Sequence, residues 1–127
     1  ERIVELYAEA ELAVVPSLYE GFSLPAIEAM ACGVPVLATT GGALPEVVGA
    51  DGVSARVVPT SDPSALAAGI VELLGDRHQR DRIGQAGRER VLDLFTWHAC
   101  ARGMVEVWEA ELDERRGTQL SGSHAHR

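Results

Sequence analysis

The sequence predicts an α/β fold in which a partial, doubly wound parallel sheet is followed by helices. Short apolar runs alternate with helical patterns through residue 58, each run is closed by a turn or loop residue, and the pattern from residue 62 onward is helical. Alternation at this spacing is typical of right-handed crossovers in a parallel sheet. Three strands are fewer than such sheets usually have, so we expect the front of the domain to precede this chain.

The first half of that pattern begins with a helix over 1–10, where apolar residues recur at helical spacing. The run 12–15 is short and continuously apolar, which favours a buried parallel strand. Ser23 can cap the next helix, because its hydroxyl can accept from a first-turn amide. Pro25 lies in the first turn, where a missing amide hydrogen costs nothing, and Gly33 ends the helix.

The second half continues with a strand over 34–38 and a short helix over 44–48 that stops at Gly49. A third strand is expected over 55–58, and Pro59 ends it. The remaining helices are expected over 63–74, 77–94 and 97–115.

The domain is therefore expected to span 1–115. The tail 116–127 is polar and aperiodic, so we expect it to be disordered, with His124 and His126 inside it. The arginines between Arg77 and Arg90 are interspersed with acidic residues, which favours a solvated helix face.

Composition restricts the function classes. The chain has 127 residues, 46% of them apolar, and a net charge of −8. This charge disfavours binding to nucleic acid or to an anionic membrane, and the apolar runs are too short for a membrane span. Two cysteines without metal spacing, and first residues unlike a leader, favour a cytoplasmic protein with no metal and no cofactor.

Two carboxylates with seven residues between them, Glu20 and Glu28, are the most informative feature of the chain. Glu20 lies in a loop that contains glycine. Glu28 is the one polar side chain between Leu24 and Cys32, so we expect its helix to be buried on most sides. A buried carboxylate without donors costs several kcal/mol. Glu28 is therefore expected to accept hydrogen bonds from the protein or from the paired hydroxyls of a ligand.

The loops after the first two strands are expected to open on the same edge of the sheet, where such folds bind ligands. Glycine permits a close backbone approach there, and the amides that begin a helix suit phosphate or sugar hydroxyls. The candidate residues are Glu20, Gly21, Phe22, Ser23, Leu24 and Glu28, with Thr40, Gly41 and Gly42 as a second part of the rim.

Less specific interpretations stay open for these residues. Glu20 taken alone could be a solvated loop residue, and Glu28 could be a structural carboxylate bonded to a neighbouring loop. Paired glycines such as Gly41 and Gly42 occur in many turns. A dinucleotide site is disfavoured, because no Gly-x-Gly-x-x-Gly follows a strand, and no Asp-x-Asp is present for a metal-diphosphate site.

The segment Pro-Ser-Leu-Tyr-Glu-Gly-Phe-Ser-Leu-Pro-Ala-Ile-Glu-Ala-Met-Ala-Cys-Gly-Val-Pro-Val, residues 16–36, resembles the signature of the retaining, nucleotide-sugar-dependent glycosyltransferases of the GT-B fold. This is the group 1, or family 4, type. The resemblance continues through residues 41–48 and on to 95–97. It implies a Rossmann-like half of the GT-B fold, namely a C-terminal donor-binding domain whose acceptor-binding partner domain is N-terminal and absent from this chain.

The resemblance also implies roles for individual residues. Glu20 would engage hydroxyls of the donor sugar near the developing positive charge, and the amides of Gly21 to Leu24 would line the sugar and the diphosphate. Glu28 would accept from the ribose hydroxyls of a UDP- or GDP-linked sugar. Transfer would proceed with retention and without a bound metal, and this chain alone is expected to be inactive.

Other classes remain as alternatives. The chain could be a non-catalytic nucleotide-sugar-binding module, or a remnant of the fold without a ligand. A glycogen-type phosphorylase or a sugar-nucleotide epimerase is disfavoured by the complete two-glutamate segment. The last helix carries an apolar stripe that is expected to be partly uncovered, so we expect self-association. The stripe consists of Trp97, Ala101, Met104, Trp108 and Leu112.

Overall fold

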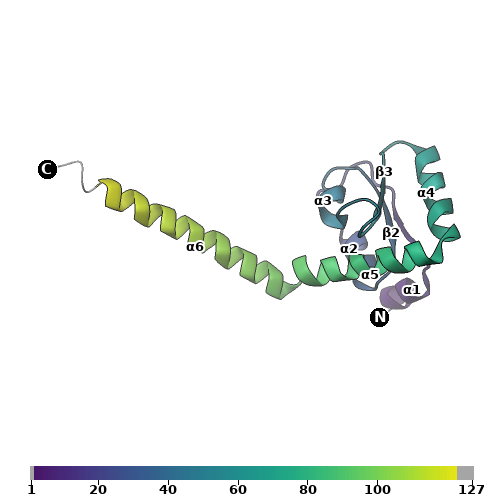
Figure 1. Ribbon diagram of the computed structural model, residues 1–127, viewed down its shortest axis with the longest axis horizontal. Coiled ribbons are helices and arrows are strands. Elements are labelled where there is room, and N and C mark those ends of the chain that lie inside the picture. Colours follow the sequence, from purple (N-terminus) through teal and green to yellow (C-terminus); the bar gives the residue numbers. More distant parts are fainter. Residues whose placement is uncertain (1, 123–127) are drawn as a thin grey trace. The chain divides into compact units, whose positions relative to one another are not determined.

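The computed structural model describes residues 2–122, and side chains through Arg115 (Figure 1). The helices are α1 (Arg2–Glu9), α2 (Leu24–Ala31), α3 (Leu44–Val48), α4 (Pro63–Gly75), α5 (Arg77–Leu94) and α6 (Trp97–Gly122). The strands are β1 (Ala13–Val15), β2 (Val36–Thr39) and β3 (Arg56–Val58). The chain divides into two units, Glu1–Asp93 and Leu94–Arg127, and each is described by itself.

The first unit contains a parallel sheet of order β1-β2-β3, in which Val14 pairs with Leu37 and Ala38 pairs with Val57. Helix α2 packs against β1 and β2, α3 packs against β2, and α4 packs against β2 and β3. Figure 1 shows the sheet between α2 and α3 on one side and α4 on the other. The predicted α/β fold with parallel strands is therefore confirmed.

The core follows from the apolar runs that predicted the strands. Every residue of β2 is buried, as expected for the central strand of a parallel sheet covered on both faces. Leu37 from β2 packs with Val58 from β3, Leu73 from α4 and Ile83 from α5. Met30 of α2 is fully buried as well.

Local signals set the helix ends. The Ser23 hydroxyl caps α2 by accepting from the amide of Ala26, at 3.4 Å, and Pro25 lies in the first turn, as predicted. Gly33 ends α2 with a φ of 77°, a left-handed conformation that glycine adopts without strain. Asp62 caps α4 in the same way as Ser23 caps α2, since its Oδ1 accepts from the amide of Ala65 at 2.9 Å.

Helix α5 lies along the amino-terminal edge of the sheet and contacts the segments that lead into β2 and β3. A Cβ on Gly84 would stand 2.2 Å from the carbonyl oxygen of Gly33, and a Cβ on Gly87 would stand 3.0 Å from that of Ser54. Glycine at both positions lets the helix approach the backbone of the sheet layer closely. The carboxyl ends of the strands, where the candidate site lies, are at the opposite edge.

The expectation that the arginines of α5 form a solvated face holds for Arg77, Arg82 and Arg88, which are exposed, whereas Arg80 and Arg90 are partly buried. Most of these arginines also donate to backbone carbonyls, which the sequence did not predict. Arg80 donates to the carbonyl oxygens of Leu73 and Leu74, at 2.7 and 2.6 Å. Three more arginines donate to backbone carbonyls in this way: Arg82 to Gly52, Arg88 to Ala31, and Arg90 to both Glu46 and Val47. These carbonyls end α2, α3 and α4 or lie in a turn, so the guanidinium groups satisfy acceptors that helices leave unpaired.

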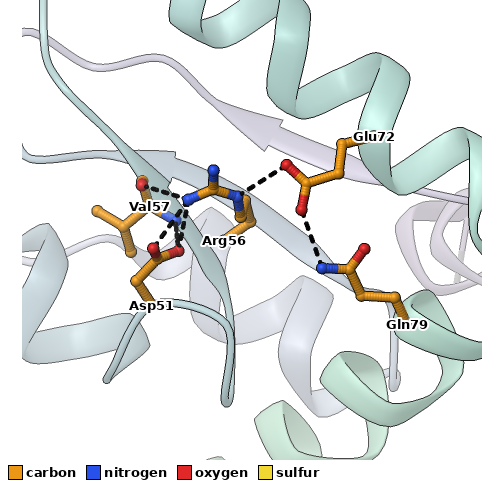
Figure 2. A network of polar contacts seen from close by, with 5 residues as sticks. All are labelled: Asp51, Arg56, Val57, Glu72 and Gln79. Atoms are coloured by element: carbon orange, nitrogen blue, oxygen red, sulfur yellow. Dashed lines mark hydrogen bonds and ion pairs between the residues drawn. The ribbon is translucent and has the colours of Figure 1, made fainter.

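A polar network closes the outer edge of β3 (Figure 2). The Asp51 carboxylate accepts from the backbone amide of Val57 at 2.8 Å and from the Arg56 guanidinium at 2.8 Å. Arg56 also reaches Glu72 on α4, at 3.3 Å, and Gln79 on α5 donates to the same carboxylate at 3.0 Å. An edge strand with its outward amide paired in this way is protected against further strand pairing.

The network makes stability depend on acidity. Partial burial acts to raise the pKa of Asp51, but the hydrogen bond from Val57 and the charge of Arg56 prevail and lower it. The Gln79 amide, followed by Arg56, lowers the pKa of Glu72. Because the folded pKa values lie below the unfolded ones, of about 4, this contribution is present above about pH 4 and is lost as the pH falls through the folded values.

We therefore expect Asp51→Asn to weaken the loss of stability in acid. Asparagine keeps an acceptor for the Val57 amide but carries no charge to protonate. The measurement is urea unfolding at pH 6 and at pH 3, with Asp93→Asn, an exposed α5 carboxylate outside the network, as the control. The expected result is a smaller difference between the two pH values for Asp51→Asn than for the parent and the control. Equal differences in all three proteins would contradict this assignment.

The second unit contains α6, which the Thr96 hydroxyl caps by accepting from the amide of Ala99 at 3.1 Å. The stripe residues Trp97, Met104, Trp108 and Leu112 are exposed. Self-association through them stays a prediction, which light scattering of the chain at high concentration checks, since a strict monomer would contradict it. None of the helices in the described part combines the length and apolarity needed to cross a bilayer.

The helix α6 extends to Gly122, beyond the expected end at Arg115. The rest of the expected disordered tail, including His124 and His126, lies outside the described residues.

Candidate functional site

The candidate site lies at the carboxyl edge of the sheet, where β1 leads into the loop before α2 and β2 leads into the loop before α3. Because β1 and β2 are parallel neighbours, the two loops lie on the same edge, as the sequence predicted. The second loop is fixed to β3 as well. The amide of Thr40 donates to the carbonyl of Val58 at 2.9 Å, and the Thr40 hydroxyl accepts from the amide of Thr60 at 3.2 Å.

Glu20 is held by both its side chain and its backbone. The Ser17 hydroxyl donates to Oε2 of Glu20 at 2.7 Å, and the Thr39 hydroxyl donates to the carbonyl of Ser17. The backbone carbonyl of Glu20 accepts from the amide of Ala43 at 2.8 Å. Glu20 is half-buried, so it is a fixed carboxylate rather than a freely solvated loop residue.

Gly41 and Gly42 set the distance between the two loops. A Cβ on Gly41 would stand 2.5 Å from the carbonyl oxygen of Ser17, and a Cβ on Gly42 would stand 2.4 Å from that of Glu20. Gly42 also has a φ of 60°. Both positions therefore require glycine because the backbone of the neighbouring loop lies so close. The sequence alone predicted only a turn or part of the rim and did not reveal this contact.

The loop around Gly21 differs from this pair. In the described part of the chain, and apart from its two chain neighbours, no atom lies within 4 Å of the position that a Cβ on Gly21 would occupy, and its φ is not positive. Phe22 and Leu24 are exposed beside it, at 52% and 60%. The Ser23 side chain is fully buried as the helix cap, so only its backbone can face a ligand. The first amides of α2 lack carbonyl partners within the helix, and the helix dipole makes this end favourable for an anion.

The expectation that Glu28 is enclosed by apolar neighbours is wrong, because its side chain is exposed. Helix α2 buries Ala26, Ala29 and Met30, which lie on one face at helical spacing, while its other face reaches solvent. The uninterrupted apolar sequence of the helix concealed this division. Burial therefore does not oblige Glu28 to find hydroxyl partners.

Glu28 lies beside the phenol of Tyr7, a residue of α1 that is not among the candidate residues predicted from the sequence. The Tyr7 hydroxyl donates to the carbonyl of Pro25 at 3.2 Å. Burial raises the pKa of Tyr7, and the nearby Glu28 carboxylate raises it further. The structure thus joins Glu20 to Ser17 and Ala43, with Thr39 holding the Ser17 carbonyl, whereas it places Glu28 against α1.

The candidate residues offer several hydrogen-bonding groups on one side of the first unit. These groups are the fixed carboxylate of Glu20, the exposed Glu28 and the amides at the amino end of α2. In the described part of the chain, no three His, Cys, Asp or Glu side chains are grouped to hold a metal ion. Carboxylates accept hydrogen bonds from hydroxyl groups, and backbone amides donate hydrogen bonds to hydroxyl and phosphate oxygens.

Comparison with known proteins identifies relatives of this chain. The sequence model of the family described as glycosyl transferases group 1 matches residues 1–90. The MMP alpha-(1->4)-mannosyltransferase of Mycolicibacterium hassiacum is 49% identical over 109 residues, which are 86% of this chain and 26% of that protein. The chain therefore spans about a quarter of the length of this curated relative.

Two solved structures share the fold. Sucrose-phosphate synthase from Thermosynechococcus elongatus matches with a TM-score of 0.74 and 41% identity, over 86% of this chain and 27% of its own. The C-terminal domain of a glycosyl transferase group 1 family protein from Francisella tularensis matches with a TM-score of 0.67 and 33% identity, over 72% of this chain and 47% of its own.

Proposed function

Because this chain belongs to the group 1 glycosyl transferases, we propose that it is the donor-binding part of a longer glycosyltransferase, which moves a sugar from a nucleotide-sugar to an acceptor. Its sheet and helices match the Rossmann-like half of the GT-B fold. The observation that carries the proposal is the anchored Glu20 loop, which stands on the same edge as the exposed turn at Gly21 and the amino end of α2.

In this proposal Glu20 contacts the donor sugar as the catalytic carboxylate. The Ser17 hydroxyl orients the Glu20 carboxylate, and the Ala43 amide holds the Glu20 backbone, before a ligand arrives. Fixed charges of this kind stabilise developing positive charge without reorganisation, which is how an oxocarbenium-like transition state is favoured. The proposal includes transfer with retention at the anomeric carbon.

The diphosphate and nucleoside occupy the other half of the site in this proposal. The backbone from Gly21 to Leu24 faces the diphosphate, where the open position at Gly21 leaves room for it. Glu28 accepts from the ribose hydroxyls of UDP or GDP. This role rests on its place in the family signature and on the accessibility of its carboxylate.

We expect the chain to bind UDP or GDP, and Glu28→Gln to weaken that binding about tenfold or more, because hydrogen bonds to a charged group contribute about 1.5–3 kcal/mol. Isothermal titration calorimetry of the 127-residue chain measures both effects. Glu89→Gln, an exposed carboxylate on α5 at the opposite edge of the sheet, is the matched control and should bind like the parent.

Three results would contradict parts of the proposal. A parent chain that binds neither nucleotide would favour a remnant of the fold without a ligand. Equal affinity of the parent and Glu28→Gln would remove the ribose role. The proposal also holds that the chain transfers no sugar by itself, so transfer from a nucleotide-sugar to a simple acceptor by this chain alone would refute that part.

A further inference from the structure

Helix α3 connects the candidate site to the opposite edge of the sheet. It has five residues, and an isolated helix of this length is not stable in water. Its position must therefore be set by tertiary contacts at its two ends and by the burial of Leu44, Val47 and Val48. One end contacts the Glu20 loop and the other end contacts α5.

The carboxyl-terminal end of α3 is held by side chains from outside the helix. Arg90 of α5 donates from Nε to the carbonyl of Val47 at 2.9 Å and from Nη2 to that of Glu46 at 2.6 Å. The Ser54 hydroxyl donates to the carbonyl of Val48 at 2.6 Å. A cation at this end of a helix is also favoured by the helix dipole.

Gly49 makes room for this arrangement. Its φ is 87°, and a Cβ there would stand 2.3 Å from the Ser54 hydroxyl oxygen and 3.0 Å from Nε of Arg90. The side chain of Arg90 thus enters a space that only glycine leaves free. The planar guanidinium spans two successive carbonyls, which the single ammonium of a lysine does not reproduce.

The amino-terminal end of α3 is bonded to the candidate site. The amide of Ala43 donates to the carbonyl of Glu20 at 2.8 Å, and the amide of Leu44 donates to the carbonyl of Gly41 at 3.2 Å. Gly42 packs directly on the backbone of Glu20. A shift of α3 therefore moves the hydrogen-bond donor and the close contact that hold the Glu20 loop.

We propose that Arg90 is a positioning residue for the Glu20 loop, acting through α3 from the far edge of the sheet. The guanidinium holds the carbonyls of Glu46 and Val47 and so fixes the position of α3. The Ala43 amide, at the other end of α3, then holds the backbone of Glu20. The link to ligand binding rests on the proposed function, whereas the link between Arg90 and the loop does not. The hydrogen bonds of Arg90 go to Glu46 and Val47 of α3, so its effect on the loop is indirect.

The test compares Arg90→Met and Arg90→Lys with Arg82→Met in the full chain. Arg82 is the matched control, because it lies on the same helix and also donates to a carbonyl, that of Gly52 at 2.8 Å, but does not contact α3. Amide hydrogen exchange by NMR reports on Ala43, with the amide of Ala38 in the central strand as the reference for global opening. This reference separates loss of the loop's position from loss of overall stability.

We expect Arg90→Met to speed exchange at Ala43 at least tenfold relative to Ala38, Arg90→Lys to give an intermediate increase, and Arg82→Met to stay within twofold of the parent. Unchanged relative exchange in Arg90→Met would overturn the proposal. If Arg90→Met does not fold, Arg90→Lys decides, because exchange equal to that of the parent overturns the proposal and faster exchange supports it.

Nucleotide affinity provides the second readout. A parent chain that binds UDP or GDP should lose at least threefold in affinity in Arg90→Met, with Arg82→Met unchanged, and equal affinity in all three would overturn the link to the ligand. A parent chain that binds neither nucleotide would contradict the proposed function, while the exchange experiment would still decide whether Arg90 positions the loop.

Discussion

Gly84→Ala should lower the free energy of unfolding by about 3 kcal/mol. The new methyl group would overlap backbone atoms, which cannot move aside as a flexible side chain could. A Cβ at this position would stand 2.2 Å from the carbonyl oxygen of Gly33 and 3.4 Å from the backbone nitrogen of Pro35. These are backbone atoms of the turn into the central strand. A hydrogen bond of 2.9 Å from the Gly33 amide to the carbonyl of Met30 fixes this turn.

Relief of this overlap requires α5 to move away from the sheet. That movement would withdraw Ile83 from the core cluster and would lengthen the arginine hydrogen bonds to the ends of α2 and α3. The loss therefore combines overpacking with partial loss of burial and of helix capping, which are separate sources of destabilisation.

Urea denaturation of the parent, Gly84→Ala and Gly75→Ala measures the effect. Gly75 ends α4, and a Cβ there meets no atom within 4 Å. The same substitution at this position should leave stability unchanged or raise it by up to about 1 kcal/mol, because alanine restricts the unfolded chain. A loss below about 1 kcal/mol in Gly84→Ala would contradict the close packing of α5.

The elements themselves were predictable because their signals are local. Strand β2 appears in the sequence as an apolar run, and α2 is delimited by a capping serine, a first-turn proline and Gly33. Each signal acts within a few residues, so no knowledge of the tertiary fold is needed to recognise it. The parallel order of the strands followed from their alternation with helices.

The features that the sequence did not predict depend on partners far along the chain. Arg90 finds its acceptor 44 residues away at Glu46, and Arg88 finds its acceptor 57 residues away at Ala31. Composition alone describes these arginines as charged surface residues. The exposure of Glu28 was missed for a related reason, because an apolar helix sequence does not reveal which face a neighbouring element covers.

The candidate site was predicted in part. The position of the two loops on one edge followed from strand direction, and Glu20 was selected as a candidate by its spacing to Glu28. The hydrogen bonds that fix Glu20 were only partly predictable. Ser17 is local, but Ala43 reaches Glu20, and Thr39 reaches Ser17, only through the fold. The close contact of Gly42 with the Glu20 backbone also arises only in the folded chain and was not predictable from the sequence.

Gly42→Ala should have the largest effect on the proposed donor site, lowering nucleotide affinity at least tenfold. Alanine at a φ of 60° costs about 1–2 kcal/mol in the left-handed region. Its Cβ would also stand 2.4 Å from the carbonyl oxygen of Glu20 and 2.9 Å from its nitrogen. Because both atoms belong to the backbone, the overlap is relieved only if the Glu20 loop moves, and this breaks the hydrogen bond from Ala43.

Two matched variants separate the causes in calorimetric titrations with UDP and GDP. Gly52→Ala places alanine at a φ of 72° with no atom within 4 Å, so it carries the strain without the overlap and should lose stability but not affinity. Gly21→Ala has neither the backbone strain nor the overlap, so its stability should stay within about 0.5 kcal/mol of the parent. It should still bind nucleotide more weakly, because its methyl group enters the space assigned to the diphosphate. If Gly42→Ala binds as tightly as Gly52→Ala, the contact between the two loops does not shape the site. If Gly21→Ala binds like the parent, the diphosphate lies elsewhere.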